Sequence, residues 1–276
     1  MMKNIDSKTV ASFGDEWSRF DQSGMSNEEA TKAFNEYFAI FPWEQLPRDA
    51  TGFDMGCGSG RWANFVAPKV GHLNCVDPSI AIEVAQKKLG AHSNISYHNT
   101  SVSDSGLKKE SQDFGYSLGV LHHVPDTQAA IHSCVELLKP GSPLLLYLYY
   151  ALDNKPWWYK AIWKTSDLAR KLIYRLPPTI KHLVTDSVAL LVYFPLARLS
   201  RILERMGMRV DNIPLAHYRT HTFYTMRTDS RDRLGTPLES RFTKKQIFEM
   251  MQSAGLENIT FSPNPPFWCA VGTKKI

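Results

Sequence analysis

Two acidic residues and a glycine-rich turn early in the chain have the types and spacing to bind a small, partly cationic ligand. Residues 54–61 read Asp-Met-Gly-Cys-Gly-Ser-Gly-Arg, and Asp77 closes the next apolar run. Because glycine lacks a Cβ atom, the backbone N–H groups of such a turn can approach a ligand closely. Asp54 precedes the first glycine by two residues, where it would attract the ammonium group of an amino-acid-like ligand, directly or through water, and repel a pyrophosphate.

The glycine spacing distinguishes between two classes of cofactor. Gly56, Gly58 and Gly60 form the pattern G-x-G-x-G, and Arg61 and Trp62 follow. The dinucleotide fingerprint G-x-G-x-x-G requires its third glycine one position further on. The turn therefore argues against a dinucleotide, and an NAD-dependent oxidoreductase is the weakest of the functions that this sequence suggests.

The turn resembles that of the class I S-adenosylmethionine-dependent methyltransferases, particularly small-molecule enzymes similar to those of ubiquinone and menaquinone biosynthesis. Three further segments follow in the order of that family: residues 113–124 resemble its fourth strand, 137–142 the turn before the fifth strand, and 254–256 the helix end before the last two strands. The resemblance covers roughly residues 50–150 and 242–273. It indicates the cofactor class and gives no information on the methyl acceptor.

The resemblance implies that S-adenosylmethionine is the cofactor. The turn would hold its methionine end, and Asp77 would bind the ribose hydroxyls. After the third strand the family often has an acid near the adenine, whereas here Ser101, Asp104 and the backbone at Val102 are the alternatives. Trp17 either covers the cofactor or packs in the core, and Cys57 is not expected to act as a nucleophile. The predicted cofactor-binding residues are Trp17, Asp54, Gly56, Cys57, Gly58, Gly60, Asp77, Pro78, Ser101, Val102 and Leu118.

Two histidines are the candidate catalytic residues. His122 and His123 follow the expected fourth strand at its carboxyl end, the edge where ligands bind in open α/β sheets. On an extended segment neighbouring side chains point to opposite sides, so we expect at most one of them to face the cavity. Methyl transfer from a sulfonium requires a positioned acceptor and, when the acceptor is a hydroxyl, a base that removes its proton. Either histidine is a candidate for that base.

Two other interpretations of the histidines stay open. The segment can simply shape the cofactor loop by hydrogen bonding, or the pair can bind a metal together with Asp126, although no third ligand is well placed. We therefore predict no metal site.

Contacts to the acceptor are expected from two segments. Tyr147 and Tyr149 alternate at the end of the expected fifth strand and so share a face. His217, Tyr218 and Arg241 belong to a polar region that faces the acceptor in similar enzymes, with a solvated loop as the alternative. Nothing in these residues selects O-, N-, S- or C-methylation.

Alternating strand and helix patterns predict an α/β fold, a Rossmann-like class I methyltransferase sheet that is mostly parallel with an antiparallel last strand. A helical cap would be inserted after the fifth strand, which divides the chain into 1–150, 151–241 and 242–276. Thr243 and Gln246 match a capping box at a helix start. Strands are expected near 52–55, 72–76, 95–98, 113–118, 143–149, 259–261 and 268–273, and helices within 10–45 and near 61–67, 80–89 and 127–138.

The basic residues concentrate in the expected cap. From Lys155 to Arg209 there are 11 Lys and Arg against 3 acids, a local charge of +8, whereas the whole chain carries +5. Aromatic residues are interleaved with them. Such a stretch suits an anionic membrane surface or an anionic or apolar substrate, with an ordinary solvated helical cap as the alternative. Nucleic-acid binding is not expected, because no known module pattern accompanies the charge.

Composition limits the remaining possibilities. With 276 residues, 43% of them hydrophobic, the chain can bury one large core. Its four cysteines lack C-x-x-C spacing and fit a reduced, cytoplasmic setting, with membrane association as an option. We expect neither a secretory signal at 1–13 nor a transmembrane helix, since the most apolar window, 187–197, is short and contains Pro195. The sequence does not indicate an oligomeric state.

The sequence thus predicts methyl transfer from S-adenosylmethionine to a small molecule, anionic or lipid-linked. The alternative is a non-catalytic module that binds S-adenosylmethionine or S-adenosylhomocysteine and acts through its cap. Asp54, the glycines and Asp77 support cofactor binding in both cases, so they do not separate an enzyme from a sensor.

Overall fold

The computed structural model describes residues 4–22 and 24–276, which form two compact units. The first contains the chain up to Asp21, Thr31–Ala151 and Leu238–Ile276, and the second contains Gln22–Ala30 and Leu152–Pro237. The chain therefore enters the second unit twice.

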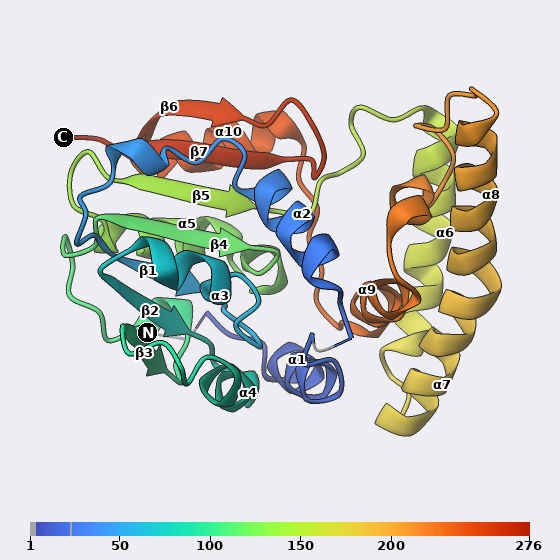
Figure 1. Ribbon diagram of the computed structural model, residues 1–276, viewed down its shortest axis with the longest axis horizontal. Helices are drawn as coiled ribbons and strands as arrows, with labels where there is room; N and C mark the ends of the chain where they lie inside the picture. Colours follow the sequence, from blue (N-terminus) through green and yellow to red (C-terminus); the bar gives the residue numbers. More distant parts are fainter. Residues whose placement is uncertain (1–3, 23) are drawn as a thin grey trace. The chain divides into compact units, whose positions relative to one another are not determined.

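The first unit is built on one seven-stranded sheet with the strand order β3-β2-β1-β4-β5-β7-β6 (Figure 1). Neighbours from β3 to β5 pair in parallel, whereas β7 pairs antiparallel with both β5 and β6. This confirms the predicted fold class. The strands are β1 (Thr51–Met55), β2 (His72–Val76), β3 (Ile95–His98), β4 (Phe114–Leu118), β5 (Pro143–Tyr147), β6 (Leu256–Phe261) and β7 (Cys269–Lys274).

The strand order changes direction between β1 and β4. From β1 the chain proceeds outward through β2 to β3, then returns to the other side of β1 to form β4 and β5. In open α/β sheets such a switch point leaves a crevice outside the carboxyl ends of the two strands, and ligands bind there. The strands end at Met55 and Leu118, so the glycine-rich turn and the histidine pair both begin at this crevice.

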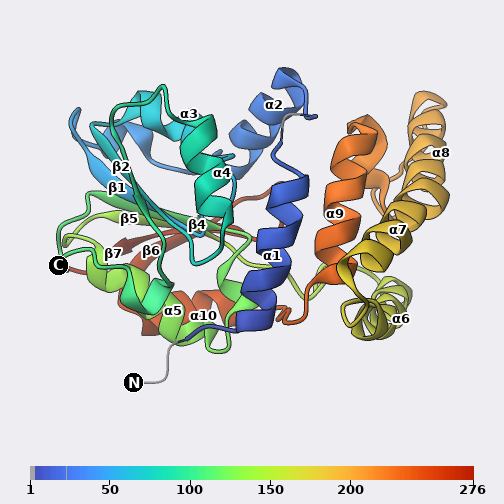
Figure 2. The ribbon, with the colours of Figure 1, turned by 90° about the horizontal axis from the view of Figure 1, so that it is seen from below.

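Helices cover both faces of the sheet (Figure 2). One apolar cluster includes Val66, Leu73 and Ala85 and lies under α3 and α4, and the other includes Ile131, Leu144 and Met251 and lies under α5 and α10. Every residue of β4 is buried, as expected for a central strand covered on both sides. The α-helices of the first unit are α1 (Ser7–Arg19), α3 (Ala63–Val66), α4 (Ala81–Lys88), α5 (Thr127–Leu137), α10 (Lys244–Ser253) and most of α2 (Asn27–Tyr37), whose first residues belong to the second unit.

Local hydrogen bonds fix the starts of the helices near the crevice. The Asp6 carboxylate accepts a bond from the Thr9 N–H of α1, and Asp126 caps α5 in the same way. At α10 the Thr243 hydroxyl accepts from the Gln246 N–H, while the Gln246 side chain accepts from the Thr243 N–H at 2.9 Å. The predicted capping box is confirmed. Such caps contribute about 1 kcal/mol each to helix stability.

The second unit is helical and consists mainly of α6 (Trp157–Ile173), α7 (Pro178–Val188), α8 (Phe194–Arg205) and α9 (Phe223–Gly235) (Figure 1). A π-helical turn joins α7 to α8, so Pro178–Arg205 is one continuous helix. Pro195 does not end it, because the π-helical turn Ala189–Tyr193 directly precedes the proline and interrupts the regular i→i−4 hydrogen bonds there.

This helix is longer than the sequence indicated. Its 28 residues include an 18-residue window with a mean hydropathy of 1.4, of which 28% is buried. By length and composition alone it is therefore long and apolar enough to cross a membrane, which the short window 187–197 did not indicate.

Candidate active site

The glycine-rich turn leaves β1 in a conformation that favours glycine. The φ angle is +86° at Gly56 and +51° at Gly58, in the left-handed region where other residues are strained. A Cβ atom on Gly58 would lie 3.3 Å from the indole Nε1 of Trp17. The structure thus brings Trp17, on α1, against the turn, as expected of a side chain that covers a ligand there.

Asp77 connects this turn to the start of α4. One carboxylate oxygen accepts the Gly58 N–H at 2.9 Å, and the other accepts the Ser79 N–H at 2.9 Å and the Ser79 hydroxyl at 2.6 Å. Burial raises the pKa of Asp77, and the bonds from Ser79 and Gly58 oppose the rise. A carboxylate offers about four lone-pair sites, so these three bonds leave Asp77 able to accept a further hydroxyl.

Asp54 is a buried carboxyl group without an ordinary hydrogen bond. Its side chain is 0% exposed, and neither oxygen has a partner within bonding distance among the described residues. Burial raises its pKa to about 8, the nearby Tyr116 hydroxyl opposes the rise, and the Asp77 charge adds to it. An orphaned buried acid of this kind fits a site that receives an ammonium group.

The other predicted cofactor residues lie at or after the carboxyl ends of β1 to β4. Ser101 and Val102 are buried where β3 gives way to a 3-10 helix, and Leu118 is buried at the end of β4. Pro78 is half-buried beside Asp77. Burial raises the pKa of the Cys57 thiol well above its usual value, so the thiol is protonated and poorly suited to nucleophilic attack.

The two histidines lie side by side, contrary to the expectation that they would point apart. Leu121–His123 is a 3-10 helix, so the segment is not extended and neighbouring side chains no longer alternate across it. The two rings are 4.0 Å apart between centroids, and both residues are buried. Phe13 of α1 packs edge-on against His123 at 4.9 Å.

Their hydrogen bonds place the ring protons differently. The Tyr149 N–H donates to His122 Nδ1 at 3.4 Å, so in the neutral ring the proton is on Nε2. His123 Nδ1 lies 2.7 Å from the Leu238 carbonyl oxygen, which can only accept, so this proton is on Nδ1. Burial, His123 and Arg241 hold the pKa of His122 well below its usual value. His123 Nε2 is therefore the basic nitrogen of the pair, and His122 Nε2 is a donor.

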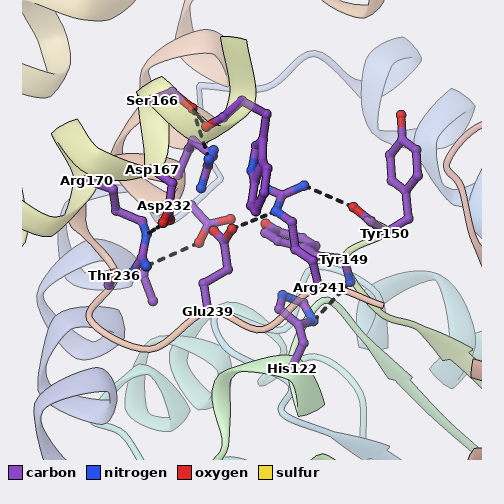
Figure 3. A network of polar contacts seen from close by, with 12 residues as sticks. His122, Tyr149, Tyr150, Ser166, Asp167, Arg170, Asp232, Thr236, Glu239 and Arg241 are labelled. Carbon is purple, nitrogen blue, oxygen red and sulfur yellow. Dashed lines mark hydrogen bonds and ion pairs between the residues drawn. The ribbon is translucent and has the colours of Figure 1, made fainter. Parts of the chain in front are cut away.

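Tyr149 and Arg241 complete this cluster (Figure 3). The Tyr149 ring stacks on His122 with 3.9 Å between centroids, and the Arg241 guanidinium lies 5.1 Å from the Tyr149 ring centre. Arg241 Nε donates to Glu239 at 2.7 Å. Burial is the largest single influence on the pKa of Arg241 and lowers it, but the charge and hydrogen bond of Glu239, with smaller contributions from Tyr149 and Tyr147, together raise it. Tyr147, 5.9 Å from the Tyr149 ring, extends the aromatic wall.

His217 and Tyr218 belong to the second unit, on the 3-10 helix Ala216–Thr220. The Tyr218 ring packs against Tyr193 at 5.2 Å, and His217 lies 4.5 Å from His221. Their assignment as acceptor contacts stays a prediction.

Sequence reasoning missed three contributors to the site. Tyr116 pairs with Asp54 in the parallel register of β1 and β4, a contact that requires knowledge of the strand order. Asn99 donates to the backbone carbonyls of Asp77 and Ser79 at 3.2 and 3.0 Å, and so fixes the loop after β3. Glu239 is only 1% exposed beside Arg241. The sequence signal for Glu239 was its position two residues before Arg241.

Within residues 4–22 and 24–276, no cluster of three or more His, Cys, Asp or Glu side chains has the arrangement to hold a metal ion. The four cysteines are free and buried.

Comparison with known proteins decides the domain type. Residues 53–146 match the family model described as "Methyltransferase domain". This part of the chain is therefore similar to methyltransferase domains. A ubiquinone biosynthesis O-methyltransferase of Xanthomonas axonopodis pv. citri is 26% identical over 60% of this chain and 66% of that protein. The corresponding protein of Alkalilimnicola ehrlichii is 32% identical over 37% and 42%, respectively. The chain thus spans less than two thirds of these relatives.

Solved structures agree on the fold. The carbon methyltransferase CurJ is similar with a TM-score of 0.56 and 13% identity, over 99% of this chain and 62% of that one. The S-adenosylmethionine-dependent methyltransferase SibL is similar with a TM-score of 0.53 and 11% identity, over 90% and 56%. The resemblance to class I methyltransferases, carried by the glycine-rich turn, is therefore confirmed for domain and fold.

A matched pair of glycine substitutions tests the turn. Gly58→Ala should weaken binding of S-adenosylhomocysteine at least about tenfold, because it adds strain at φ +51° and a methyl group where the ligand would approach. Gly141→Ala introduces a comparable φ strain, at +82°, with no atom within 4 Å. Calorimetry should show normal affinity for Gly141→Ala. Equal affinities in both variants would show that the turn is not in contact with the ligand.

Proposed function

We propose that this protein transfers the methyl group of S-adenosylmethionine to a hydroxyl of a small aromatic acceptor. The observation that carries the proposal is His123, whose Nδ1 is fixed by the Leu238 carbonyl and whose Nε2 is left basic at the carboxyl end of β4. The names of the curated relatives, ubiquinone biosynthesis O-methyltransferases, support a hydroxyl acceptor.

The residues at the crevice fit the proposed cofactor. Asp54 is a buried acid that lacks a partner and suits the amino group, Asp77 retains acceptor capacity for the ribose, and Gly58 leaves space beside Trp17. When bound, S-adenosylmethionine supplies an electrophilic methyl group on a sulfonium. The turn and the two acids would hold it in place.

The protein's own part in the reaction is to position the acceptor and accept its proton. His123 Nε2 would take the hydroxyl proton while the Leu238 carbonyl stabilises the resulting imidazolium through Nδ1. The His122 Nε2–H would donate a hydrogen bond to the acceptor oxygen. The rings of Phe13, Tyr147 and Tyr149 would flank an aromatic acceptor and exclude water. The buried Arg241 would attract an anionic substituent.

Asp77→Ala should weaken cofactor binding by about 1.5–3 kcal/mol, the typical contribution of hydrogen bonds to a charged acceptor. Because Asp77 also holds Gly58 and Ser79, the comparison needs Ser79→Ala, which removes one internal bond of the carboxylate and no ribose ligand. Calorimetry with S-adenosylhomocysteine should show a much smaller effect for Ser79→Ala. An unchanged affinity in a folded Asp77→Ala protein would refute the ribose role.

A transfer assay separates an enzyme from a sensor. The protein is incubated with methyl-labelled S-adenosylmethionine and a panel of catechols, quinols and hydroxybenzoates, with amines and thiols as comparison acceptors. We expect label in phenolic ethers. Binding of S-adenosylhomocysteine without transfer to any acceptor would favour the non-catalytic module, and transfer to amines or thiols alone would contradict the hydroxyl acceptor.

A further inference from the structure

The second unit carries most of the exposed large hydrophobic side chains among the described residues. Among the described residues, every exposed large hydrophobic side chain lies in this unit except Ile80, Phe248 and Ile276. Single exposed apolar residues are ordinary, but a concentration on one unit marks an interaction surface.

The long helix presents a continuous apolar face. Between Ile180 and Leu199 every exposed residue is apolar, and Leu183 and Leu191 are 69% and 71% exposed. Twenty residues of helix extend for about 30 Å. A soluble helix bundle would carry polar side chains on this outer side.

The interior of the unit contains buried charged side chains beside a small apolar cluster around Tyr193, Ala197 and Met226. Arg170, Lys181 and Arg231 are at most 7% exposed. Arg170 donates to Asp167 and to the carbonyls of Thr236 and Pro237, each at 2.8 Å (Figure 3). Charged residues are rarely buried in water-soluble domains. Polar side chains turned inward and apolar ones turned outward are the arrangement expected of helices that contact lipid.

α6 carries lysine side chains beside an exposed apolar stripe of its own. Trp157, Leu168 and Leu172 are 80%, 63% and 69% exposed. At spacings of 11 and 15 residues they lie on one side of the helix, and Lys164 and Lys171 lie next to them. Tryptophan and lysine at the border of an apolar face are typical of helices that bind the interface of an anionic bilayer.

We propose that the second unit docks on an anionic lipid bilayer through the outer faces of α6 and of the helix Pro178–Arg205. The charge of +8 between Lys155 and Arg209 favours anionic lipid over a second copy of the chain, because two such faces would repel each other. This surface does not depend on the proposed methyl transfer.

The helix lies in the interface and does not span the bilayer. Its inner side is paired with α9, where Arg227 donates to Asp186 through two bonds of 2.9–3.0 Å. α9 has 13 residues, so it extends for about 20 Å and is too short to cross the hydrocarbon core with its partner. A charged pair of this kind is costly inside lipid, so the inner side stays out of the membrane.

Sedimentation of the full chain with vesicles tests the proposal. We expect binding to vesicles that contain phosphatidylglycerol, weaker binding to phosphatidylcholine alone, and release by alkaline carbonate.

The double variant Leu183→Glu, Leu191→Glu should bind at least about tenfold more weakly, because two apolar side chains no longer enter the interface. Lys164→Glu with Lys171→Glu should remove the dependence on phosphatidylglycerol and on salt.

Phe248→Glu is the matched control, since Phe248 is 40% exposed on α10 of the first unit. It should leave vesicle binding unchanged, and circular dichroism should show all variants folded. The proposal fails if the chain binds neither kind of vesicle, or if Phe248→Glu weakens vesicle binding as much as the leucine variant does. It also fails if carbonate leaves the chain in the membrane. A dimer in light scattering that the leucine variant dissociates would assign the face to a second copy instead.

Discussion

Cofactor binding should release a proton from Asp54. At pH 7 the buried carboxyl group, with its pKa near 8, is mostly protonated in the unliganded protein, and an ammonium group beside it would ionise it. The affinity for S-adenosylhomocysteine should therefore rise by up to about tenfold per pH unit between pH 6 and 7.5. Calorimetry in buffers of different ionisation enthalpy measures the released proton.

Asp54→Asn is the matched variant. It should bind S-adenosylhomocysteine about 1.5–3 kcal/mol more weakly and release no proton.

The raised pKa of Asp54 also affects folding. Between about pH 4 and 8 the native unliganded protein binds more protons than the unfolded chain, so its stability should fall as the pH rises through this window. Asp54→Asn should lose that dependence and melt at a higher temperature at pH 8. Undiminished proton release in the variant would exclude Asp54 as the ammonium ligand.

His123→Asn should lower kcat by about a hundredfold to ten-thousandfold, the usual contribution of a general base. The asparagine amide can replace Nδ1–H as the donor to Leu238 but provides no basic nitrogen at the position of Nε2. The affinity for S-adenosylhomocysteine should stay the same in this variant.

His122→Asn is the control for this substitution. Its side-chain oxygen can replace Nδ1 as the acceptor of the Tyr149 N–H, so we expect less than about a tenfold loss of kcat, the share of a single hydrogen bond. A larger loss of kcat than in His123→Asn would mean that His122 is the base and His123 the hydrogen-bond donor. Weaker cofactor binding in both variants, with kcat unchanged, would mean that the histidines only shape the loop.

The sequence predicted the glycine-rich turn and the strands beside it because their contacts are local. Apolar runs ended by Asp54 and Asp77 define two adjacent parallel strands, whose carboxyl ends meet at one edge of the sheet. The positive φ angles of Gly56 and Gly58 follow from the same pattern. The strands and the helices over the sheet were predictable for this reason.

The hydrogen bonds of the histidine pair could not be predicted, because their partners are distant in sequence. The proton position on His123 depends on Leu238, 115 residues away, and that on His122 depends on the backbone of Tyr149. The continuity of the long helix rests on a π-helical turn before Pro195, which has no clear sequence signal. The buried charged side chains and exposed apolar side chains of the second unit can be recognised only when the burial of each side chain is known.

Parallel calorimetric titrations with S-adenosylhomocysteine and NAD test the central claim most directly. We predict tight binding of S-adenosylhomocysteine with the loss of a proton at pH 7, and no measurable binding of NAD. Tight binding of NAD without binding of S-adenosylhomocysteine would contradict the assignment of Asp54, Gly58 and Asp77 to this cofactor.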